Sequence, residues 1–177
     1  MKDRKLTGIE MGRIPAEAYR SLPPSGIVVV LDNIRSAHNV GSVLRSADAF
    51  KADKVYMCGI SPVPPSPEIH KSALGAEDSV PWEKRQDTAA LLRELRVDGY
   101  RVVAVEQTVN SVKLPSFVRE EAIKYALVLG NEVDGISDEA LAEADLSLEI
   151  PQFGSKHSLN VSVCAGIILY HFAAGKK

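Results

Sequence analysis

The chain alternates between short apolar runs and segments in which apolar positions recur with helical spacing. Residues 26–32 (GIVVVLD) form an unbroken apolar run ending in an aspartate, which is typical of a strand buried on both faces of a parallel sheet. Apolar side chains within residues 40–50 fall three and four positions apart, so we expect a helix there, with Asn39 near its N-terminus. Further short strands are predicted at residues 54–58, 101–106, 125–130 and 145–150.

Helical segments and one loop occupy much of the sequence between these strands. Residues 87–97 are amphipathic and precede Gly99, which favours a helix end, and Ser137 is expected to cap a short helix. Residues 161–173 are apolar nearly all round, so this helix is expected in the core or in a subunit interface. The proline-rich residues 61–67 are expected to form an exposed loop. The alternation predicts an α/β fold with a mostly parallel sheet flanked by helices.

The composition fits one globular domain preceded by an arm. Residues 1–25 contain scattered charges and three prolines, and we expect an N-terminal arm there with a short helix near residues 15–21. Residues 26–177 are predicted to form a single domain. No apolar run approaches the roughly 20 residues that cross a bilayer, and the first residues lack a signal-peptide core. We therefore expect a cytoplasmic protein in which Cys58 and Cys164 are buried, reduced thiols.

The charge distribution gives a weak indication of a nucleic-acid partner. The net charge is -2, but residues 1–50 hold seven Lys/Arg against five Asp/Glu. These seven cations could form a phosphate-facing surface: Lys2, Arg4, Lys5, Arg13, Arg20, Arg35 and Arg45. On charge alone, a solvated basic terminus explains them equally well.

Three polar clusters interrupt apolar sequence where core packing has no use for them. They are residues 39–45 (NVGSVLR), residues 129–132 (LGNE) and residues 150–160 (IPQFGSKHSLN). An arginine, glutamate or asparagine in apolar surroundings costs free energy unless it is paired. Ligand crevices of open α/β sheets lie at the carboxyl ends of strands. We therefore expect the three clusters to assemble into one polar site.

Several residues of these clusters have two interpretations. Arg45 can grip a phosphate or hydroxyl with its planar fork, or form a structural ion pair with an acid such as Glu132. Glu132 can face a ligand crevice or lie exposed at a strand–turn corner, while Gly130 can admit a ligand close to the backbone. Ser158 and Asn160 can belong to the polar site or serve only as helix caps.

Other common sites are missing from the sequence. One glycine, and not the Gly-x-Gly-x-x-Gly pattern of dinucleotide sites, follows the first predicted strand, and no Walker motif occurs. His38, His70 and the two cysteines lack the spacing of metal ligands, so no metal is expected. His157 could act as a base, although a histidine in an exposed loop is more often inert.

The three clusters resemble a known family. Asn39-x-Gly41-x-x-x-Arg45, then Leu-Gly-Asn-Glu, then Ile-Pro followed by Ser-Leu-Asn-Val-Ser are similar, in this order, to the three motifs of the SpoU/TrmH RNA 2′-O-ribose methyltransferases, which belong to the SPOUT superfamily. Residues 69–77 also resemble the family's segment between the first two motifs. The resemblance extends from about residue 26 to residue 172, most of the chain.

The resemblance implies a fold, a cofactor and a set of site residues. It implies a C-terminal trefoil knot, a homodimer, and S-adenosylmethionine bound in the knotted loops. By position, the residues expected to contact this cofactor are Thr108, Gly130, Ile150 and Leu159. Arg45 is similar to the arginine proposed to activate the ribose 2′-hydroxyl, and the residues that match the active site around it are Asn39, Glu132, Ser158 and Asn160.

The sequence as a whole therefore predicts an S-adenosylmethionine-dependent RNA 2′-O-methyltransferase, acting on tRNA in preference to rRNA. Two departures from the family bear on this. Gln152 stands where many relatives have Met. No additional RNA-binding domain is expected before the catalytic region, so RNA recognition is expected from the arm, the domain surface and the partner subunit. A catalytically inert knotted RNA-binding module is the alternative, and a flavodoxin-like small-molecule binder is a third interpretation that leaves the three clusters unused.

Overall fold

The computed structural model describes residues 3–7, 10–12, 14–156 and 158–174. Within these ranges seven strands form one sheet in the order β3-β2-β1-β6-β4-β7-β5, and every neighbouring pair is parallel. The strands are β1 (Ile27–Asp32), β2 (Lys54–Cys58), β3 (Trp82–Arg85), β4 (Tyr100–Val105), β5 (Val112–Lys113), β6 (Lys124–Leu129) and β7 (Leu146–Glu149). The predicted α/β fold with a parallel sheet is confirmed.

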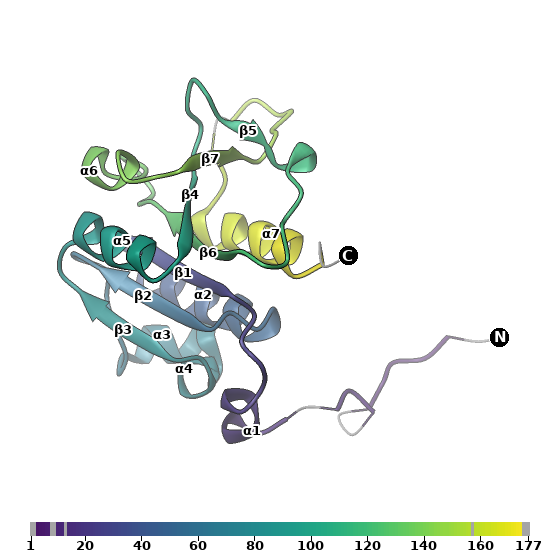
Figure 1. Cartoon of the computed structure of the whole chain (residues 1–177). Coiled ribbons are helices and arrows are strands. Elements are labelled where there is room, and N and C mark those ends of the chain that lie inside the picture. Colours follow the sequence, from purple (N-terminus) through teal and green to yellow (C-terminus); the bar gives the residue numbers. More distant parts are fainter. Residues whose placement is uncertain (1–2, 8–9, 13, 157, 175–177) are drawn as a thin grey trace.

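Helices cover both faces of this sheet (Figure 1). The helices are α1 (Ala16–Arg20), α2 (Ala37–Ala49), α3 (Pro67–Ala73), α4 (Ala76–Ser79), α5 (Thr88–Val97), α6 (Asp138–Leu141) and α7 (Val161–Ala174), with a short 3-10 turn η1 (Leu114–Ser116). One face carries α5 and α6, and the other carries α2, α3, α4 and α7. None of the helices in the described ranges has both the length and the apolar character needed to cross a membrane.

Strand β1 shows why the first apolar run is continuous. All six of its residues are buried. Ile27, Val29 and Leu31 belong to the core shared with α2 and α7, whereas Val28 and Val30 pack in the core under α5. Successive side chains of a strand point to opposite faces, so a sheet covered on both sides requires an apolar residue at each of these positions.

Local hydrogen bonds confirm one predicted detail and correct two others. Helix α2 starts at Ala37 because the hydroxyl of Ser36 accepts the backbone N–H of Asn39 at 3.2 Å. Ser137 precedes α6, but its side chain makes no capping hydrogen bond. Ser61, expected in an exposed loop, is buried, since its hydroxyl accepts the N–H of Ile34 and donates to the carbonyl of Leu31.

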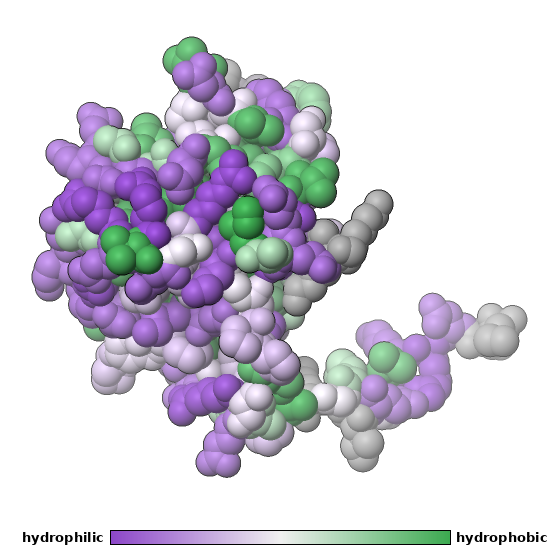
Figure 2. Space-filling view, in the orientation of Figure 1, coloured by the Kyte–Doolittle hydropathy of each residue, from purple (hydrophilic) through white to green (hydrophobic). Residues whose placement is uncertain are grey.

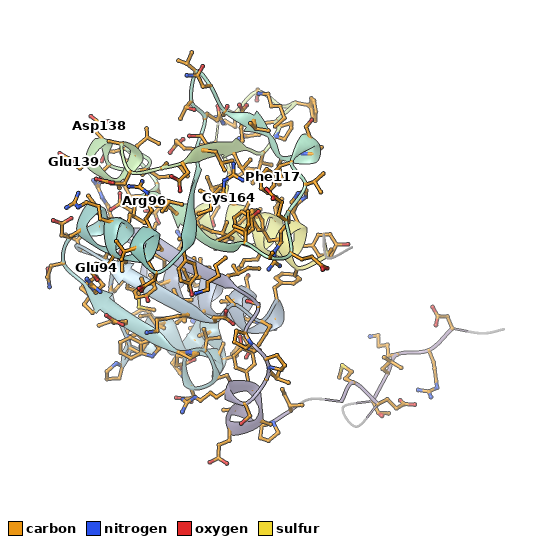
Figure 3. All side chains as sticks on the ribbon, viewed as in Figure 1. Glu94, Arg96, Phe117, Asp138, Glu139 and Cys164 are labelled. Carbon is orange, nitrogen blue, oxygen red and sulfur yellow. The ribbon has the colours of Figure 1, made fainter. Side chains whose placement is uncertain are left out.

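Interactions between side chains fix the two helices on the α5 face. Arg93 of α5 binds the Glu143 carboxylate at 2.8 Å, and Arg96 binds its other oxygen at 3.1 Å. Figure 3 shows Arg96 between α5 and α6.

The two cysteines are unpaired as predicted, but only Cys58 is fully buried, while Cys164 is half-buried.

The N-terminal segment docks through α1 and then extends away from the sheet (Figure 1). Tyr19 is buried, and its hydroxyl lies 3.2 Å from the carbonyl oxygen of Ala47 and 3.0 Å from that of Ala52. Figure 2 shows hydrophobic side chains on the extended part, where Leu6, Met11 and Ile14 are exposed. The division into an arm and a catalytic domain at residue 26 stays a prediction.

Candidate active site

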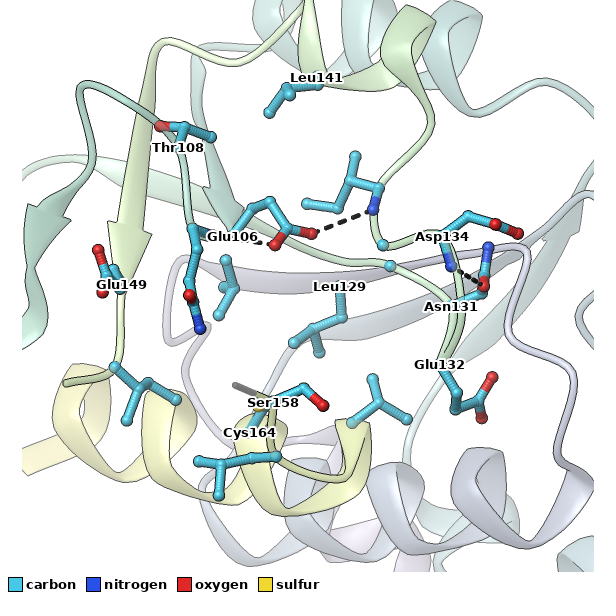
Figure 4. Close-up of a pocket in the computed structure, with 18 of the residues that line it drawn as sticks. Glu106, Thr108, Leu129, Asn131, Glu132, Asp134, Leu141, Glu149, Ser158 and Cys164 are labelled. Carbon is cyan, nitrogen blue, oxygen red and sulfur yellow. Dashed lines mark hydrogen bonds between the residues drawn. The ribbon is translucent and has the colours of Figure 1, made fainter. Parts of the chain in front are cut away.

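A cavity of about 490 Å³ lies at the carboxyl ends of three adjacent strands, β6, β4 and β7. Its walls are formed by the residues that follow these strands and by the start of α7 (Figure 4). The neighbouring strand β1 pairs with β6 on one side and β2 on the other, so the order of strands along the chain reverses beside the cavity. This is the position where open α/β sheets hold their ligands.

The loop after β6 forms one wall of the cavity and is folded tightly. The side-chain oxygen of Asn131 accepts the N–H groups of Val133 at 2.9 Å and Asp134 at 2.8 Å. Asn131 and Gly135 exchange two backbone hydrogen bonds of 3.0 and 3.1 Å. Residues 131–137 therefore form a compact turn that closes back on the end of β6.

Gly130 has a structural role in addition to the predicted one, which stays a prediction. It lines the cavity, but a Cβ atom at this position would lie 2.1 Å from the carbonyl carbon of Gly135 and 2.1 Å from the nitrogen of Ile136. Glycine is thus required because the chain's own turn packs against it. The expected close approach of a ligand at Gly130 is not what excludes a side chain there.

Two buried or half-buried carboxylates fix the far end of the same loop. Glu106, directly after β4, accepts the N–H of Ile136 at 3.2 Å. Asp32, at the end of β1, is fully buried and accepts the N–H of Ser137 at 2.8 Å and the hydroxyl of Thr88 at 2.5 Å. The sequence reasoning missed both residues, although each ends a buried strand and so carried the same signal as Glu132.

Asn39, Glu132 and Asn160 form one hydrogen-bonded chain beside the cavity. The amide nitrogen of Asn39 donates to the Glu132 carboxylate at 2.6 Å, and the amide nitrogen of Asn160 donates to the Asn39 side-chain oxygen at 3.1 Å. Asn160 also caps α7, because its side-chain oxygen accepts the N–H of Ser162 at 2.8 Å. The predicted assembly of the three polar clusters therefore occurs through these three residues.

The hydrogen bonds of Glu132 keep it ionised. Burial acts to raise the pKa of its carboxyl group, but the donors Asn39 and the backbone N–H groups of Arg35 and Ser36 outweigh this effect, so the pKa lies below its ordinary value. Glu132 is consequently a carboxylate at neutral pH, held in one orientation next to the cavity.

Arg45 does not take part in the hydrogen bonds that link Asn39, Glu132 and Asn160. Its side chain is exposed on α2, whereas Asn39 is 7% exposed and faces the core side. Within the described ranges Arg45 makes no hydrogen bond or ion pair, and the Glu132 carboxylate accepts the side-chain amide of Asn39 and the backbone N–H of Arg35. The alternative in which Arg45 is the structural partner of Glu132 is therefore wrong, and its guanidinium is available to a ligand.

The remaining predicted residues are distributed around the cavity. Ser158 lines it and is exposed. The four residues expected to contact the cofactor also line it: Thr108, Gly130, Ile150 and Leu159. Gln152, which departs from the family pattern, is part of the same wall. His157 lies outside the described residues. The functional roles of all these residues stay predictions.

The described part of the chain contains no group of three or more His, Cys, Asp or Glu side chains that could hold a metal ion. The cavity wall combines apolar side chains with polar ones, five of which are carboxylates. It can therefore surround an organic ligand and present peptide N–H and C=O groups to it.

Comparisons with known proteins agree with this geometry. The chain is 37% identical over 158 residues to a 23S rRNA (guanosine-2′-O-)-methyltransferase, RlmB, of Nitrosomonas europaea, an alignment that covers 87% of this chain and 58% of the relative. The chain thus spans little more than half the length of this relative.

Two solved structures share the fold. An AdoMet-bound rRNA methyltransferase from Sinorhizobium meliloti superimposes with a TM-score of 0.80 at 28% identity, covering 90% of this chain and 60% of that one. A TrmH/SpoU tRNA modifying enzyme from A. aeolicus also gives a TM-score of 0.80, at 27% identity, and covers 91% of this chain and 82% of that one. The model of the SpoU rRNA Methylase family matches residues 26–170, and the chain belongs to this family.

Proposed function

We propose that the protein is an S-adenosylmethionine-dependent RNA 2′-O-ribose methyltransferase. The observation that carries the proposal is the cavity at the carboxyl ends of β6, β4 and β7, with the Asn39–Glu132–Asn160 chain beside it. Membership of the SpoU family and the names of the relatives, one a guanosine-2′-O-methyltransferase and one AdoMet-bound, support the reaction and the cofactor.

The cavity fits such a cofactor without a glycine-rich phosphate loop. Its volume of about 490 Å³ suits a nucleoside-sized ligand. The residues proposed to hold it are Thr108, Gly130, Ile150 and Leu159, all of which line the cavity. The cofactor supplies an electrophilic methyl group on a sulfonium, so no metal is needed for the transfer.

The protein's own residues must align the ribose and manage its proton. A free 2′-hydroxyl is a poor nucleophile at neutral pH, so positioning and proton removal limit the reaction. Methylation forms a bond from the 2′-oxygen to carbon, breaks the bond from that carbon to sulfur, and releases the hydroxyl proton. Asn39 and Asn160 are proposed to position the Glu132 carboxylate beside the reacting ribose, and Ser158 lies on the same wall.

Arg45 is proposed to bind the RNA. It is exposed on α2 and is free of partners in the described part of the chain, so its planar fork can bind a substrate phosphate in bidentate fashion. A guanidinium stays protonated in proteins and is therefore a poor base. The bound phosphate is the better proton acceptor, and Arg45 then serves by orienting that phosphate towards the 2′-hydroxyl.

The protein is also proposed to act as a homodimer. Helix α7 buries one side in the core, but Val163, Ile167 and Tyr170 form an apolar stripe on its outer side, with exposures of 50%, 37% and 62%. An exposed apolar stripe of this kind is typical of a subunit interface. The trefoil knot implied by the resemblance is part of the same proposal. Light scattering at micromolar concentration tests the dimer, and a stable monomer contradicts it.

The methyl-transfer assay uses purified protein, radiolabelled cofactor, and tRNA and rRNA transcripts as separate substrates, since relatives are named for both RNA classes. The sequence-based preference for tRNA is tested by comparing them. We expect a ribose-methylated nucleotide that blocks alkaline cleavage at one position. Binding of RNA with no methyl transfer, or no binding of the cofactor, supports the inert module and refutes the proposal.

A further inference from the structure

The cavity has an acidic lining. Its carboxylates are Glu106, Glu132, Asp134, Asp138 and Glu149. Among the residues that the structure describes, no lysine, arginine or histidine lines it. A neutral ligand can only donate hydrogen bonds to such a wall, whereas a ligand that carries a positive charge is also attracted by it electrostatically.

Three of these carboxylates are already neutralised or solvated. Glu149 binds the ammonium of Lys113 at 2.6 Å, and Asp134 binds the guanidinium of Arg35 at 3.2 Å. Asp138 is exposed on α6, and Figure 3 shows it at the outer edge of the molecule. Counter-ions and water therefore reduce the effect of all three on a bound ligand.

The fourth, Glu132, is exposed and accepts the Asn39 amide at 2.6 Å. Glu106 differs from these four. It is half-buried, and among the described residues its two oxygens accept only the backbone N–H groups of Gln107 at 2.9 Å and Ile136 at 3.2 Å. Within the described ranges no cation lies within ion-pair distance of it. Figure 4 shows the Glu106 side chain reaching from the end of β4 across the cavity wall towards the loop after β6. A half-buried carboxylate without a counter-ion costs free energy until a cation binds.

The surrounding backbone is shaped to keep this carboxylate in place. Gly135 has a positive φ of 73°, and a Cβ atom there would lie 2.5 Å from the Glu106 carboxylate. The effect of the charge reaches other groups of the cavity, since burial first and Glu106 second raise the pKa of the Cys164 thiol. Cys164 also lines the cavity and therefore stays a neutral thiol.

We propose that Glu106 determines ligand specificity by favouring the cationic sulfonium cofactor over the neutral thioether product that the reaction leaves. This inference rests on the proposed function. S-adenosylmethionine carries one more positive charge than S-adenosylhomocysteine, and the two molecules otherwise differ by a single methyl group. An uncompensated carboxylate in the cavity distinguishes them by this charge and so promotes release of the product.

The test compares binding of both molecules to the wild type and to Glu106→Gln by titration calorimetry. Glutamine keeps an oxygen that can accept a backbone N–H but removes the charge. We expect the affinity for S-adenosylmethionine to fall at least about tenfold, which is the effect of a unit charge about 12 Å away at an effective dielectric constant of about 20. The affinity for S-adenosylhomocysteine should change by less than about twofold, and sinefungin, which carries an amine in place of the methyl-sulfonium, should follow the cofactor.

The control is Asp138→Asn, which removes the same charge from an exposed position of the lining and should leave the ratio of the two affinities unchanged. Equal losses for cofactor and product in Glu106→Gln would mean that Glu106 only holds the loop, and would overturn the inference. A wild type that binds neither molecule refutes the proposed function instead. If Glu106→Gln does not fold, the salt dependence of the wild type provides the test. Because salt screens the attraction between charges, the ratio of the affinities for S-adenosylmethionine and S-adenosylhomocysteine should decline between about 0.05 and about 1 M salt. An unchanged ratio contradicts the inference.

Discussion

Substitution of Arg45 can distinguish a catalytic role from a structural one, because the two roles predict different effects on stability and on methyl transfer. Its exposed side chain makes no hydrogen bond or ion pair in the described part of the chain, so Arg45→Ala removes no polar interaction among those residues. Surface substitutions of this kind change the free energy of unfolding by less than about 0.5 kcal/mol. For a chain of 177 residues this shifts the melting temperature by only about 1–2 °C. Breaking a buried ion pair would instead cost about 3–5 kcal/mol.

Methyl transfer should respond very differently. Removing one charged group that positions a reacting ligand typically lowers the rate about 10²–10³-fold, so Arg45→Ala should lose activity to that extent while its affinity for S-adenosylmethionine stays nearly constant. Arg45→Lys should also be severely impaired, because a point charge does not reproduce the planar fork. Thermal melting, cofactor titration and single-turnover methyl transfer measure the three quantities on the same preparations.

The matched control is Arg93→Ala, which removes an arginine from α5 on the opposite face of the sheet. Arg93 forms a surface ion pair with Glu143, so the variant should lose less than about 1 kcal/mol of stability and remain fully active. A folded Arg45→Ala protein with wild-type activity would refute the proposed role of Arg45. A fall of more than about 6 °C in its melting temperature would refute the structural part of the reasoning.

Three other predictions follow from the loop after β6 and from α7. Gly130→Ala places a Cβ atom 2.1 Å from backbone atoms of Gly135 and Ile136, so urea unfolding should show a loss of at least about 1–3 kcal/mol, together with loss of cofactor binding; wild-type stability would show that the turn moves freely. The pKa of Glu132 is lowered in the folded protein, so its contribution to stability is present above the unfolded pKa of about 4.3 and is lost as the pH falls through the folded value; Glu132→Gln should flatten the acid side of the stability–pH curve, and an unchanged curve contradicts this. Ile167→Asp on the exposed stripe of α7 should yield a folded monomer in light scattering, and an intact dimer would place the interface elsewhere.

Buried strands and amphipathic helices of the fold could be predicted from the sequence, but short strands at the sheet edges could not. Strand β1 and helix α5 were recognisable because burial on two faces and on one face leaves a continuous or a periodic apolar pattern. Strand β3 has four half-buried residues (WEKR), and β5 has only two exposed residues at the sheet edge. Edge strands of this length bury too little surface to impose a pattern on the sequence.

The sequence predicted which three polar clusters form the site, but it did not predict which of their residues contact one another. Asn39 and Glu132 are 93 positions apart in the chain and meet only because β1 and β6 are neighbours in the sheet. Spacing along the sequence cannot supply that adjacency. Arg45 was expected among apolar residues. Because an α-helix has 3.6 residues per turn, however, the six positions between Asn39 and Arg45 place them on different faces of α2, and Arg45 lies on the exposed face. Glu106 and Asp32 carried a usable signal, since each is an acidic residue at the end of an apolar strand.

The loop 131–137 is held by residues from β1, α2 and the end of β4, at sequence separations of 105, 93 and 30 positions. Such a loop cannot take its shape before the strands on both sides of β6 have been added to the sheet. Its amide hydrogens at Ile136 and Ser137, which bind Glu106 and Asp32, should therefore exchange with solvent only when several strands open together. This wall of the cavity can therefore form only after those strands are in place, and these two amides should resist local opening as strongly as the core strands that support them.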